Sequence, residues 1–436
     1  MNGTAAFLEQ LRRTAGDDAV TTDPAALSQS AVAGLPPLAV VAPADAGGVA
    51  ATLALCAAER VPVAPAGGCT WLAAAHPPGA PPVVLSTRRL DAVTEYEPAD
   101  LVVGVQAGVT LRDLQARLRA ERQTLPLDPP AAAGATIGAT IALAGSGPLR
   151  AAHGTPRDMV LGLEIATGDG RLLRFGGRVV KNVAGYDVVR LVTGSRGTLG
   201  IVTSVFLLLR ALPDEDGTWL ADAGDAAAAA AVALAVRNRM DCDALEVLGP
   251  GVVPGADGAG RDGWVVAARV RGSGAAIAEA GEALESVAGF RRLDDADAAA
   301  FWPALGEMEA VASLCLRVAD LPASLPATLE TTAAITGGDR AWRTAAHGAS
   351  GIVRLWRSDG APLAEAGSLG SALDGAGAVH LARGGSLRWA VLPPALASLR
   401  RPDASTDPGA LKLMRGLARA FDPAGILPSP WREVTA

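Results

Sequence analysis

The stretch GGRVVKNVAGYDVVRLVTGSRGTLGIVTSVFLLLRALP, which runs from Gly176 to Pro213, decides the fold that we predict for this chain. Its glycines at positions 194, 197 and 200 come directly before a long apolar run that starts at Ile201 and ends before Pro213. A run rich in β-branched residues and bounded by glycine and proline predicts a buried strand. The stretch is therefore a glycine loop that leads into the core of a sheet.

The composition and net charge argue against several classes of protein. The chain has 436 residues, enough for two or three domains of about 100–200 residues each. Its net charge of −7 comes without a run rich in lysine or arginine, which argues against a nucleic-acid partner. The longest uncharged apolar stretches, 226–236 and 201–209, are much shorter than the roughly 20 residues of a membrane-spanning helix. The N-terminus does not resemble a signal peptide, so a cytoplasmic protein without a membrane span is expected.

The first two hundred residues alternate short strands and helices. Strands are expected near 38–43, 61–65, 83–86, 93–96 and 101–108, with a helix at 44–60. A second helix follows Thr110, whose hydroxyl forms a capping-box-like pair with Asp113. Residues 129–154 contain few that could form a core, and TGDG at 167–170 predicts the turn of a hairpin. This pattern indicates an α/β or α+β domain.

A second region begins near Asp214. It is expected to hold helices at 226–240 and 275–287 and strands at 264–272, 313–318 and 350–357, arranged as a small sheet with helices on one face. An amphipathic helix from Asp407 ends at Asp422, Pro423 and Gly425. The expected organisation is an N-terminal segment at 1–34, a first domain at 35–213, a second domain at 214–405 and a C-terminal helix and tail at 406–436.

Three glycine loops lie within the first domain, at 67–68, 134–147 and 194–200. Glycine lets backbone N–H groups approach a phosphate or a flat ring closely. Three such loops in one domain favour a large nucleotide cofactor. The Rossmann fingerprint is absent, because Gly194 to Gly200 is followed by a strand rather than a helix and no acidic residue lies about 20 residues on in the right context. The P-loop pattern is also absent.

The residues also carry a family resemblance. The stretch from ATIGATIALAGSGPLRAAHG through to RALP at 213 resembles the FAD-binding domain of the p-cresol methylhydroxylase and vanillyl-alcohol oxidase type. Within it, GGRVVKNVAGYDVVRL and GSRGTLGIVT resemble the FAD-binding subunit branch of the glycolate oxidases, and FDPAGIL in the tail resembles that family's end. The resemblance implies an α+β fold: a two-subdomain FAD-binding domain of this type, a smaller α+β cap domain, and a C-terminal helix that packs back on the FAD domain.

The same resemblance implies which residues bind FAD. Backbone groups rather than side chains are expected to contact the cofactor, since peptide N–H dipoles stabilise a diphosphate or a reduced flavin without adding a titrating group. Thr70 stands where some relatives carry a covalently linked histidine, so the FAD is expected to be non-covalent. The implied cofactor residues are Ala66, Gly67, Gly68, Cys69, Thr70, Trp71, Thr136, Ile137, Gly138, Ser146, Gly147, His153, Gly200, Ile201 and Val202.

Catalytic residues cannot be assigned from the sequence. Relatives that oxidise 2-hydroxy acids carry a histidine-rich metal and base site in the second domain. The four histidines here, at 76, 153, 347 and 380, form no H-x-x-H pattern, so no metal site is expected and His347 and His380 are read as isolated side chains. A missing base costs a factor of about 10² to 10⁴ in proton removal, which indicates that the chain does not perform the main catalytic step alone.

Two interpretations remain open for one cysteine, Cys69, and two for the tryptophans of the second region. Four cysteines lie far apart and form no CxxC, so neither a disulfide framework nor an iron–sulfur site is expected. Cys69 is either a small residue tolerated beside a ligand or a reactive thiol. The tryptophans of the second region read as core or as a partner surface: Trp302, Trp342, Trp356 and Trp389.

Three functions follow as hypotheses. The first is the FAD-binding subunit of a glycolate oxidase complex, which oxidises glycolate to glyoxylate together with a catalytic FAD subunit and an iron–sulfur subunit. The second is a stand-alone FAD-linked oxidase or dehydrogenase of another small 2-hydroxy acid, with His153 or His380 as its base. The third is a flavin-free structural subunit, motivated by departures from the family pattern at Ala66, Cys69 and Ala139.

Overall fold

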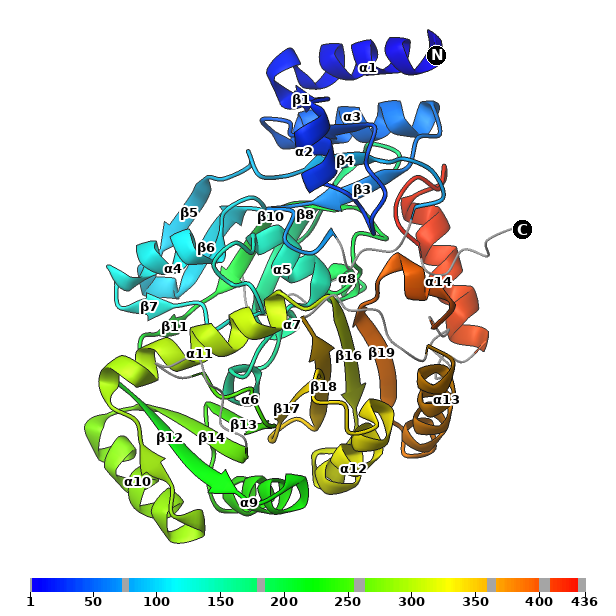
Figure 1. Cartoon of the computed structure of the whole chain (residues 1–436). Coiled ribbons are helices and arrows are strands. Elements are labelled where there is room, and N and C mark those ends of the chain that lie inside the picture. The colour runs from blue at the N-terminus through cyan, green and yellow to red at the C-terminus, as the bar shows by residue number, and fades with distance from the viewer. Residues whose placement is uncertain are drawn as a thin grey trace. The chain divides into compact units, whose positions relative to one another are not determined.

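A computed structural model describes residues 2–72, 78–178, 185–254, 263–358, 366–399 and 408–429, so His76 lies outside the described residues. The chain divides into two compact units (Figure 1). Unit 1 comprises Met1–Ser146, Thr155–Leu212 and Asp407–Ala436, and unit 2 comprises Gly147–Gly154 and Pro213–Thr406. The segment 147–154, which the sequence placed in the first domain, thus packs with unit 2.

Unit 1 is built on two main sheets. The first has the strand order β1-β2-β4-β3 and the second β5-β6-β10-β8-β9, and β11 pairs separately with β7. The first sheet consists of β1 (Val20–Thr21), β2 (Ala39–Val41), β3 (Val63–Ala66) and β4 (Val83–Ser86), and the second of β5 (Val93–Glu97), β6 (Val102–Gln106), β8 (Val160–Ala166), β9 (Leu172–Gly176) and β10 (Ile201–Leu208). The short pair is β7 (Gln123–Thr124) and β11 (Arg210–Ala211). The apolar run of the opening stretch is β10, which lies between β6 and β8 in the second sheet, as its composition predicts.

Helices of unit 1 begin at side chains that cap them. Thr110 accepts a hydrogen bond from the backbone N–H of Asp113 at the start of α4, and Asp45 accepts one from Gly48 at the start of α3. Leucines 111, 114 and 118 follow the helical period and turn one face of α4 into the core. The helices are α1 (Asn2–Ala15), α2 (Pro24–Gln29), α3 (Ala46–Ala58), α4 (Leu111–Arg119), α5 (Ile137–Leu143), α7 (Pro156–Met159), α8 (Val188–Val192) and α14 (Pro408–Phe421).

The expectation that 129–154 contributes little to a core is wrong. Ile137 and Ile141 are fully buried in the cluster that also holds β6, β8 and β10. They lie one helical turn apart on α5, so a short helix presents both to the same side. The small residues around them allow this close packing: a Cβ on Gly138 would lie 2.6 Å from the Cβ of Ala107.

The C-terminal helix packs back on unit 1, as the resemblance implied. The buried carboxylate of Asp422 accepts hydrogen bonds from the backbone N–H groups of Gly425, Ile426 and Leu427 at 2.9, 3.1 and 2.8 Å. The carbonyl of Ile426 then accepts a hydrogen bond from the N–H of Val63 on β3 at 2.8 Å. A residue following α14 therefore joins the end of the chain to the first sheet.

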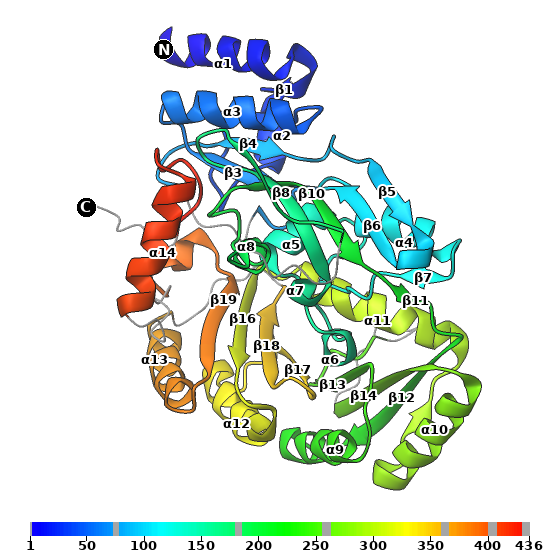
Figure 2. The same ribbon diagram turned by 180° about the vertical axis from the view of Figure 1, so that it is seen from behind.

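Unit 2 contains a larger sheet than the sequence predicted. Within the described residues its strand order is β15-β12-β14-β13-β17-β18-β16-β19 (Figure 2). All pairs are antiparallel. The strands are β12 (Glu215–Ala223), β13 (Ala244–Leu248), β14 (Trp264–Gly272), β15 (Arg291–Arg292), β16 (Leu314–Ala319), β17 (Arg343–His347), β18 (Ile352–Arg357) and β19 (Ser386–Val391).

Both faces of this sheet carry a core, which corrects the expectation of helices on one face. Successive residues along each strand point to opposite faces of the sheet, so they enter two separate hydrophobic clusters. One face packs against α9 (Ala226–Arg239), α10 (Gly274–Ala288), α12 (Leu325–Thr336) and α13 (Ala366–Ala382), and the other against α11 (Asp295–Ala310). The remaining helix of unit 2 is α6 (Arg150–His153).

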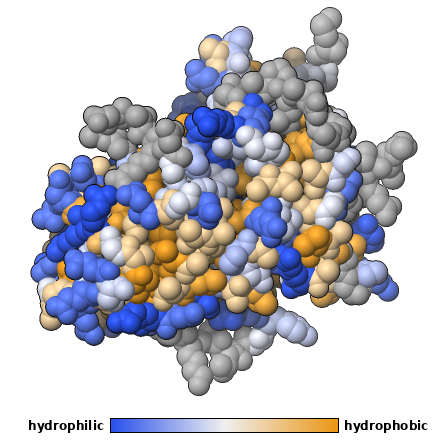
Figure 3. All heavy atoms as spheres, turned by 60° about the horizontal axis from the view of Figure 1, so that its bottom comes forward, coloured by the Kyte–Doolittle hydropathy of each residue, from blue (hydrophilic) through white to orange (hydrophobic). Residues whose placement is uncertain are grey.

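The tryptophans of unit 2 belong to its core. Trp302, Trp342 and Trp356 are buried, and Trp389 is partly buried, so the reading of these side chains as a partner surface is wrong. The apolar surface of unit 2 comes from small residues and from a few larger side chains, among them Val311 and Leu321. Figure 3 shows an apolar area on the face that carries α9 and α12, and alanines 227, 228, 231 and 235 of α9 are exposed.

Candidate functional site

The loop after β3 is pressed against the loop before α5. A Cβ on Gly67 would lie 2.0 Å from the Oγ1 of Thr136, and a Cβ on Gly68 would lie 2.7 Å from the carbonyl oxygen of Gly134. No side chain larger than hydrogen fits at either position without movement of the neighbouring loop. These two glycines therefore allow this loop to lie close to the Thr136 side chain and to the backbone of Gly134.

Three backbone N–H groups of this first loop have no hydrogen-bond acceptor among the described residues. Among the described residues, the N–H groups of Gly67, Gly68 and Cys69 make no hydrogen bond. Cys69 has a φ of +61°, a left-handed conformation of the kind that lets successive N–H groups converge on one anion. Gly68 and Thr70 are exposed, and the Ser86 hydroxyl fixes the loop by donating to the carbonyl of Gly67 at 2.9 Å. The arrangement fits a diphosphate, which would satisfy these donors.

The second loop supports the first rather than offering donors of its own. Thr136 caps α5, and the N–H groups of Ile137 and Gly138 donate to the carbonyls of Val109 and Ala107, both at 2.8 Å. Thr136 therefore contacts the loop at 66–71, while the N–H groups of Ile137 and Gly138 are used within unit 1.

The third loop, 194–200, closes the same region. The N–H of Gly194 donates to Ile141 at 3.0 Å and that of Arg196 donates to Ala142 at 2.7 Å, at the end of α5. Gly197 packs against Pro65 of β3, where an added Cβ would lie 2.8 Å from the proline ring. The three glycine loops, separated by some 130 residues in sequence, thus meet in unit 1.

Gly200, Ile201 and Val202 form the entry to the central strand. Gly200 has a φ of +145°, and a Cβ there would lie 2.7 Å from the carbonyl oxygen of Ala166. Ile201 and Val202 start β10 and pair with Ala166 and Ile165 of β8. The backbone from Gly200 onward is consequently held rigid by the sheet, as the sequence argument required.

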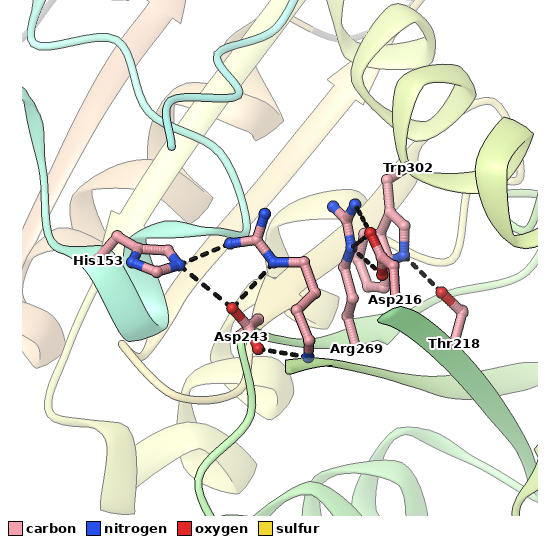
Figure 4. A network of polar contacts seen from close by, with 7 residues as sticks. His153, Asp216, Thr218, Asp243, Arg269 and Trp302 are labelled. Atoms are coloured by element: carbon pink, nitrogen blue, oxygen red, sulfur yellow. Dashed lines mark hydrogen bonds and ion pairs between the residues drawn. The ribbon is translucent and has the colours of Figure 1, made fainter. Parts of the chain in front are cut away.

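His153 lies in unit 2, on α6. Its Nε2 is 3.2 Å from the Oδ1 of Asp243 and 2.6 Å from the Nη2 of Arg271 (Figure 4). Arg271 also donates from its Nε to the same carboxylate at 3.0 Å and from its backbone N–H at 2.8 Å. Although burial opposes ionisation, the contact with His153 and the charge of Arg271 lower the pKa of Asp243. His153 thereby anchors the segment 147–154, which contains the predicted cofactor residue Gly147 and follows Ser146 in the sequence.

The neighbouring side chains in Figure 4 stabilise the sheet. Arg269 pairs with Asp216 on the adjacent strand and lies 5.6 Å from the ring centre of Trp302. The indole N–H of Trp302 donates to the hydroxyl of Thr218 at 2.9 Å. These contacts join α11 to β12 and β14.

Sequence reasoning missed a buried ionic chain in unit 2. Arg317 donates to Glu309 at 2.8 Å, and Glu309 also accepts from Arg354 at 2.7 Å. Arg354 donates in turn to Glu246 at 2.5 Å, and Glu246 is hydrogen-bonded to the Nδ1 of His347. His347 is therefore not isolated, although the sequence shows no histidine cluster. The signal that could have found this chain is a charged residue inside each of four apolar strands or helices.

Burial and neighbouring charges shift the pKa values in this chain in opposite directions. Burial raises the pKa of Glu246 to about 8, despite the charge of Arg354. Glu309 is buried too, but Arg354 and Arg317 both contact it and lower its pKa to about 2. Burial, with the charges of Arg354 and Arg150, holds the pKa of His347 well below its usual value, so its imidazole is neutral at pH 7.

His380 has one buried partner. Its Nδ1 lies 2.6 Å from the Oδ2 of Asp320, which also accepts from the hydroxyl of Thr328 at 3.0 Å. The side chains of His380 and Asp320 are both fully buried. His380 is therefore a buried, locally hydrogen-bonded histidine rather than an isolated one.

The cysteines remain protonated thiols. Burial raises the pKa of the Cys56, Cys242 and Cys315 thiols to about 12. Burial also raises the pKa of Cys69, although the positive charge of Arg88 acts in the opposite direction. A thiolate at Cys69 is thus disfavoured, which supports the reading of a small residue beside a ligand. No group of histidine, cysteine and acidic side chains suited to a metal ion occurs in the described part of the chain. Nor does any helix there have the length and hydropathy to cross a membrane.

Comparison with known families identifies the first unit. The FAD binding domain family matches residues 37–176. The chain therefore carries an FAD binding domain, and its cofactor is FAD.

Curated relatives share the same part of the chain. The chain is 45% identical over 114 residues to glycolate oxidase subunit GlcE of Escherichia coli (strain K12), which covers 26% of this chain and 33% of that protein. It is 35% identical over 185 residues to glycolate oxidase subunit GlcD of Bacillus subtilis (strain 168), covering 42% and 39%. A D-2-hydroxyglutarate dehydrogenase of Xanthomonas citri pv. viticola is 34% identical over 184 residues, covering 42% and 39%. The matched stretch thus spans less than half the length of these relatives.

Solved structures extend the likeness to the whole fold. The structure of p-cresol methylhydroxylase with substrate bound has a TM-score of 0.73 at 15% identity, and the match covers 99% of this chain and 97% of that one. A 4-ethylphenol oxidase from Gulosibacter chungangensis has a TM-score of 0.72 at 15% identity, covering 97% and 95%. The α+β fold that the sequence resemblance implied is confirmed.

Proposed function

We propose that this chain, whose residues 37–176 are an FAD binding domain, is the FAD-binding subunit of a glycolate oxidase complex. In this proposal the complex oxidises glycolate to glyoxylate and passes the electrons to a partner subunit. FAD binding is supported above all by the open N–H groups of residues 67–69, held in place by contacts that only glycine permits. The substrate is supported by likeness to two glycolate oxidase subunits.

The chain's own residues would hold the cofactor as follows. The loop Ala66, Gly67, Gly68, Cys69, Thr70 and Trp71 would bind the diphosphate through its backbone. Thr136, Ile137 and Gly138 would support that loop from α5, and Ser146 and Gly147 would complete the second contact. The backbone of Gly200, Ile201 and Val202 would face the flavin ring. Bound FAD supplies a two-electron acceptor, and peptide dipoles around it favour the reduced, negatively charged form without a titrating group.

Attachment of FAD in this proposal is non-covalent. The hydroxyl of Thr70 lies 3.5 Å from the carbonyl oxygen of Gly134, and a hydroxyl at this position offers no imidazole for a covalent link.

The partners in this proposal are a catalytic FAD subunit and an iron–sulfur subunit. Among the described residues no metal-binding group exists, so electron transfer through an iron–sulfur centre would need a second chain. A cytoplasmic location, with membrane association through partner subunits, belongs to the same proposal.

A second candidate is a stand-alone FAD-linked dehydrogenase of another small 2-hydroxy acid. Likeness to a D-2-hydroxyglutarate dehydrogenase favours it.

An absorption spectrum of the purified chain tests both candidates. We expect a two-banded flavin spectrum, with the flavin released into solution when the protein is precipitated by acid. Under anaerobic conditions, bleaching of the flavin by glycolate only after partner subunits are added supports the first candidate. Bleaching of the chain alone by D-2-hydroxyglutarate or D-lactate supports the second. A colourless protein that stays colourless with added FAD contradicts both and favours a flavin-free structural subunit.

A further inference from the structure

One face of α14 carries apolar groups but lies on the side of the helix away from its buried residue. Ala418 is the buried residue of this helix, whereas the side chain of Leu413 is 66% exposed. Because an α-helix turns by about 100° per residue, Leu413 and Gly416 both lie on the side opposite Ala418. A large apolar side chain on that side of α14 therefore has no counterpart in the core of the chain.

This face is hollowed. An open hollow of about 420 Å³ is lined by five residues of α14, namely Gly409, Lys412, Leu413, Gly416 and Leu417, which we call the outer face of α14. They stand at positions i, i+3, i+4, i+7 and i+8, which share one side of a helix. In packed helices, four residues of one helix surround a side chain that is inserted from the facing helix. The hollow thus has the arrangement that receives a side chain from a second helix.

Gly416, in the middle of the outer face, is not required by the packing of this chain. A Cβ at this position would have nothing within 4 Å among the described residues, and Gly416 is not one of the glycines with a positive φ. A glycine inside a helix destabilises that helix relative to an alanine. The missing side chain therefore gives no benefit within the chain, but it leaves room for atoms of another molecule.

Two cations follow one edge of the outer face. Lys412 and Arg419 are seven residues apart, so they lie on the same side of the helix, and both are exposed. Neither forms an ion pair with a residue that the structure describes. The sequence of α14, PGALKLMRGLARAF, contains no acidic residue. A second copy of α14 on this face would bring like charges together, whereas a helix with acidic side chains would be attracted.

We propose that the outer face of α14 binds an acidic amphipathic helix of a partner protein. An apolar side chain of that helix would enter the hollow beside Leu413 and Gly416, and its carboxylates would pair with the cations along the edge. A lipid surface is a poorer match, because an interfacial helix presents a continuous apolar face and Gly416 interrupts this one. The inference concerns α14 alone and goes beyond the proposed function, since it holds whichever substrate the flavin oxidises.

Fluorescence anisotropy of a labelled synthetic helix tests the site on the full, FAD-loaded chain. The probe has about three heptads with leucine at positions a and d and glutamate at e and g, and a second probe carries lysine in place of glutamate. We expect the glutamate peptide to bind and the lysine peptide to bind about tenfold more weakly or less. Leu413→Asp and Gly416→Leu should each weaken binding of the glutamate peptide by about tenfold or more.

Two further variants make the test specific. Gly306→Leu is the matched control, because Gly306 is also a helical glycine with nothing within 4 Å of its Cβ position, but it lies on α11 of unit 2. It should leave the dissociation constant unchanged. The double variant Lys412→Glu and Arg419→Glu should reverse the preference, so that the lysine peptide binds more tightly than the glutamate peptide.

Several results would overturn the proposal. These are no binding of the glutamate peptide, equal binding of the two peptides, and unchanged binding by Leu413→Asp. A dimer in light scattering that Leu413→Asp dissociates would assign the face to a second copy of the chain instead. Binding to phosphatidylserine vesicles that the same variant abolishes, without binding of either peptide, would assign it to a membrane surface. Should Gly416→Leu fail to fold, Leu413→Asp decides, because Leu413 is exposed.

Discussion

Gly67 shows how a single missing side chain shapes the cofactor loop. A Cβ there would meet the hydroxyl of Thr136 at 2.0 Å, so we expect Gly67→Ala to push the two loops apart. Overpacking of this kind costs about 1–3 kcal/mol of stability, and FAD should be retained at least tenfold more weakly. Flavin content after gel filtration and a urea titration measure both effects. Gly79→Ala is the control, since nothing lies within 4 Å of its Cβ position, and equal flavin loss in the two variants would refute the role of Gly67.

Glu246 couples stability to pH. Its pKa rises from 4.5 to about 8 on folding, so the folded protein binds more protons than the unfolded chain between these values. The contribution of Glu246 is therefore fully present below about pH 4.5 and is lost as the pH rises through about 8. We expect Glu246→Gln to flatten the decline of the free energy of unfolding between pH 5 and pH 8, measured by urea titration. An unchanged slope in the variant would show that other groups cause the decline.

Glu309 couples stability to pH in the opposite direction from Glu246. Its pKa falls from 4.5 to about 2, so its contribution is present above pH 4.5 and is lost as the pH falls toward 2. Removing the shared partner by Arg354→Met should destabilise the protein by about 3–5 kcal/mol, because it leaves buried Glu309 with Arg317 as its one cationic partner and removes the cationic partner of buried Glu246. Arg292→Met, at an exposed edge position, is the control. A loss below about 1 kcal/mol for Arg354→Met would contradict a buried ionic chain.

At the scale of elements, one carboxylate ties α14 to the first sheet. Asp422 accepts three backbone hydrogen bonds and is almost fully buried. We expect Asp422→Ala to cost about 2–4 kcal/mol, more than the roughly 1 kcal/mol of an exposed helix cap. Asp225→Ala, which removes the exposed cap of α9, provides the comparison. Equal losses of unfolding free energy would mean that the buried donors find other partners.

At the scale of the whole molecule, FAD should stabilise the folded state of unit 1. A ligand that binds only the folded state stabilises it in proportion to the logarithm of its concentration. Hydrogen exchange with and without FAD should therefore show added protection at 66–71, 134–147 and 194–202. The core of unit 2 around β14 and β18 serves as the internal control. Protection that appears only in unit 2 would contradict the placement of the cofactor loops.

Local patterns in the sequence predicted individual elements well. Strands such as β10 and β14, the helix α4 with its Thr110 cap, and the end of α14 at Asp422 agree with the structure. Each of these elements depends on residues close in sequence: the spacing of its apolar residues, a capping side chain or a helix-breaking residue. The buried helix α5 was missed because its apolar residues are few and small neighbours conceal them.

The sequence by itself determined the individual strands and helices, the glycine loops and the absence of an H-x-x-H pattern, because these depend on residue type and short spacing, and its family resemblance implied the FAD-type α+β fold. Only the tertiary structure decided that the three loops meet and that segment 147–154 packs with unit 2. It also decided that Arg317, Glu309, Arg354, Glu246 and His347 form one chain of contacts, which is buried except at Arg317. The physical reason is strand register: it sets which charged side chains become neighbours across a sheet, and it depends on pairings between distant segments that no local pattern specifies.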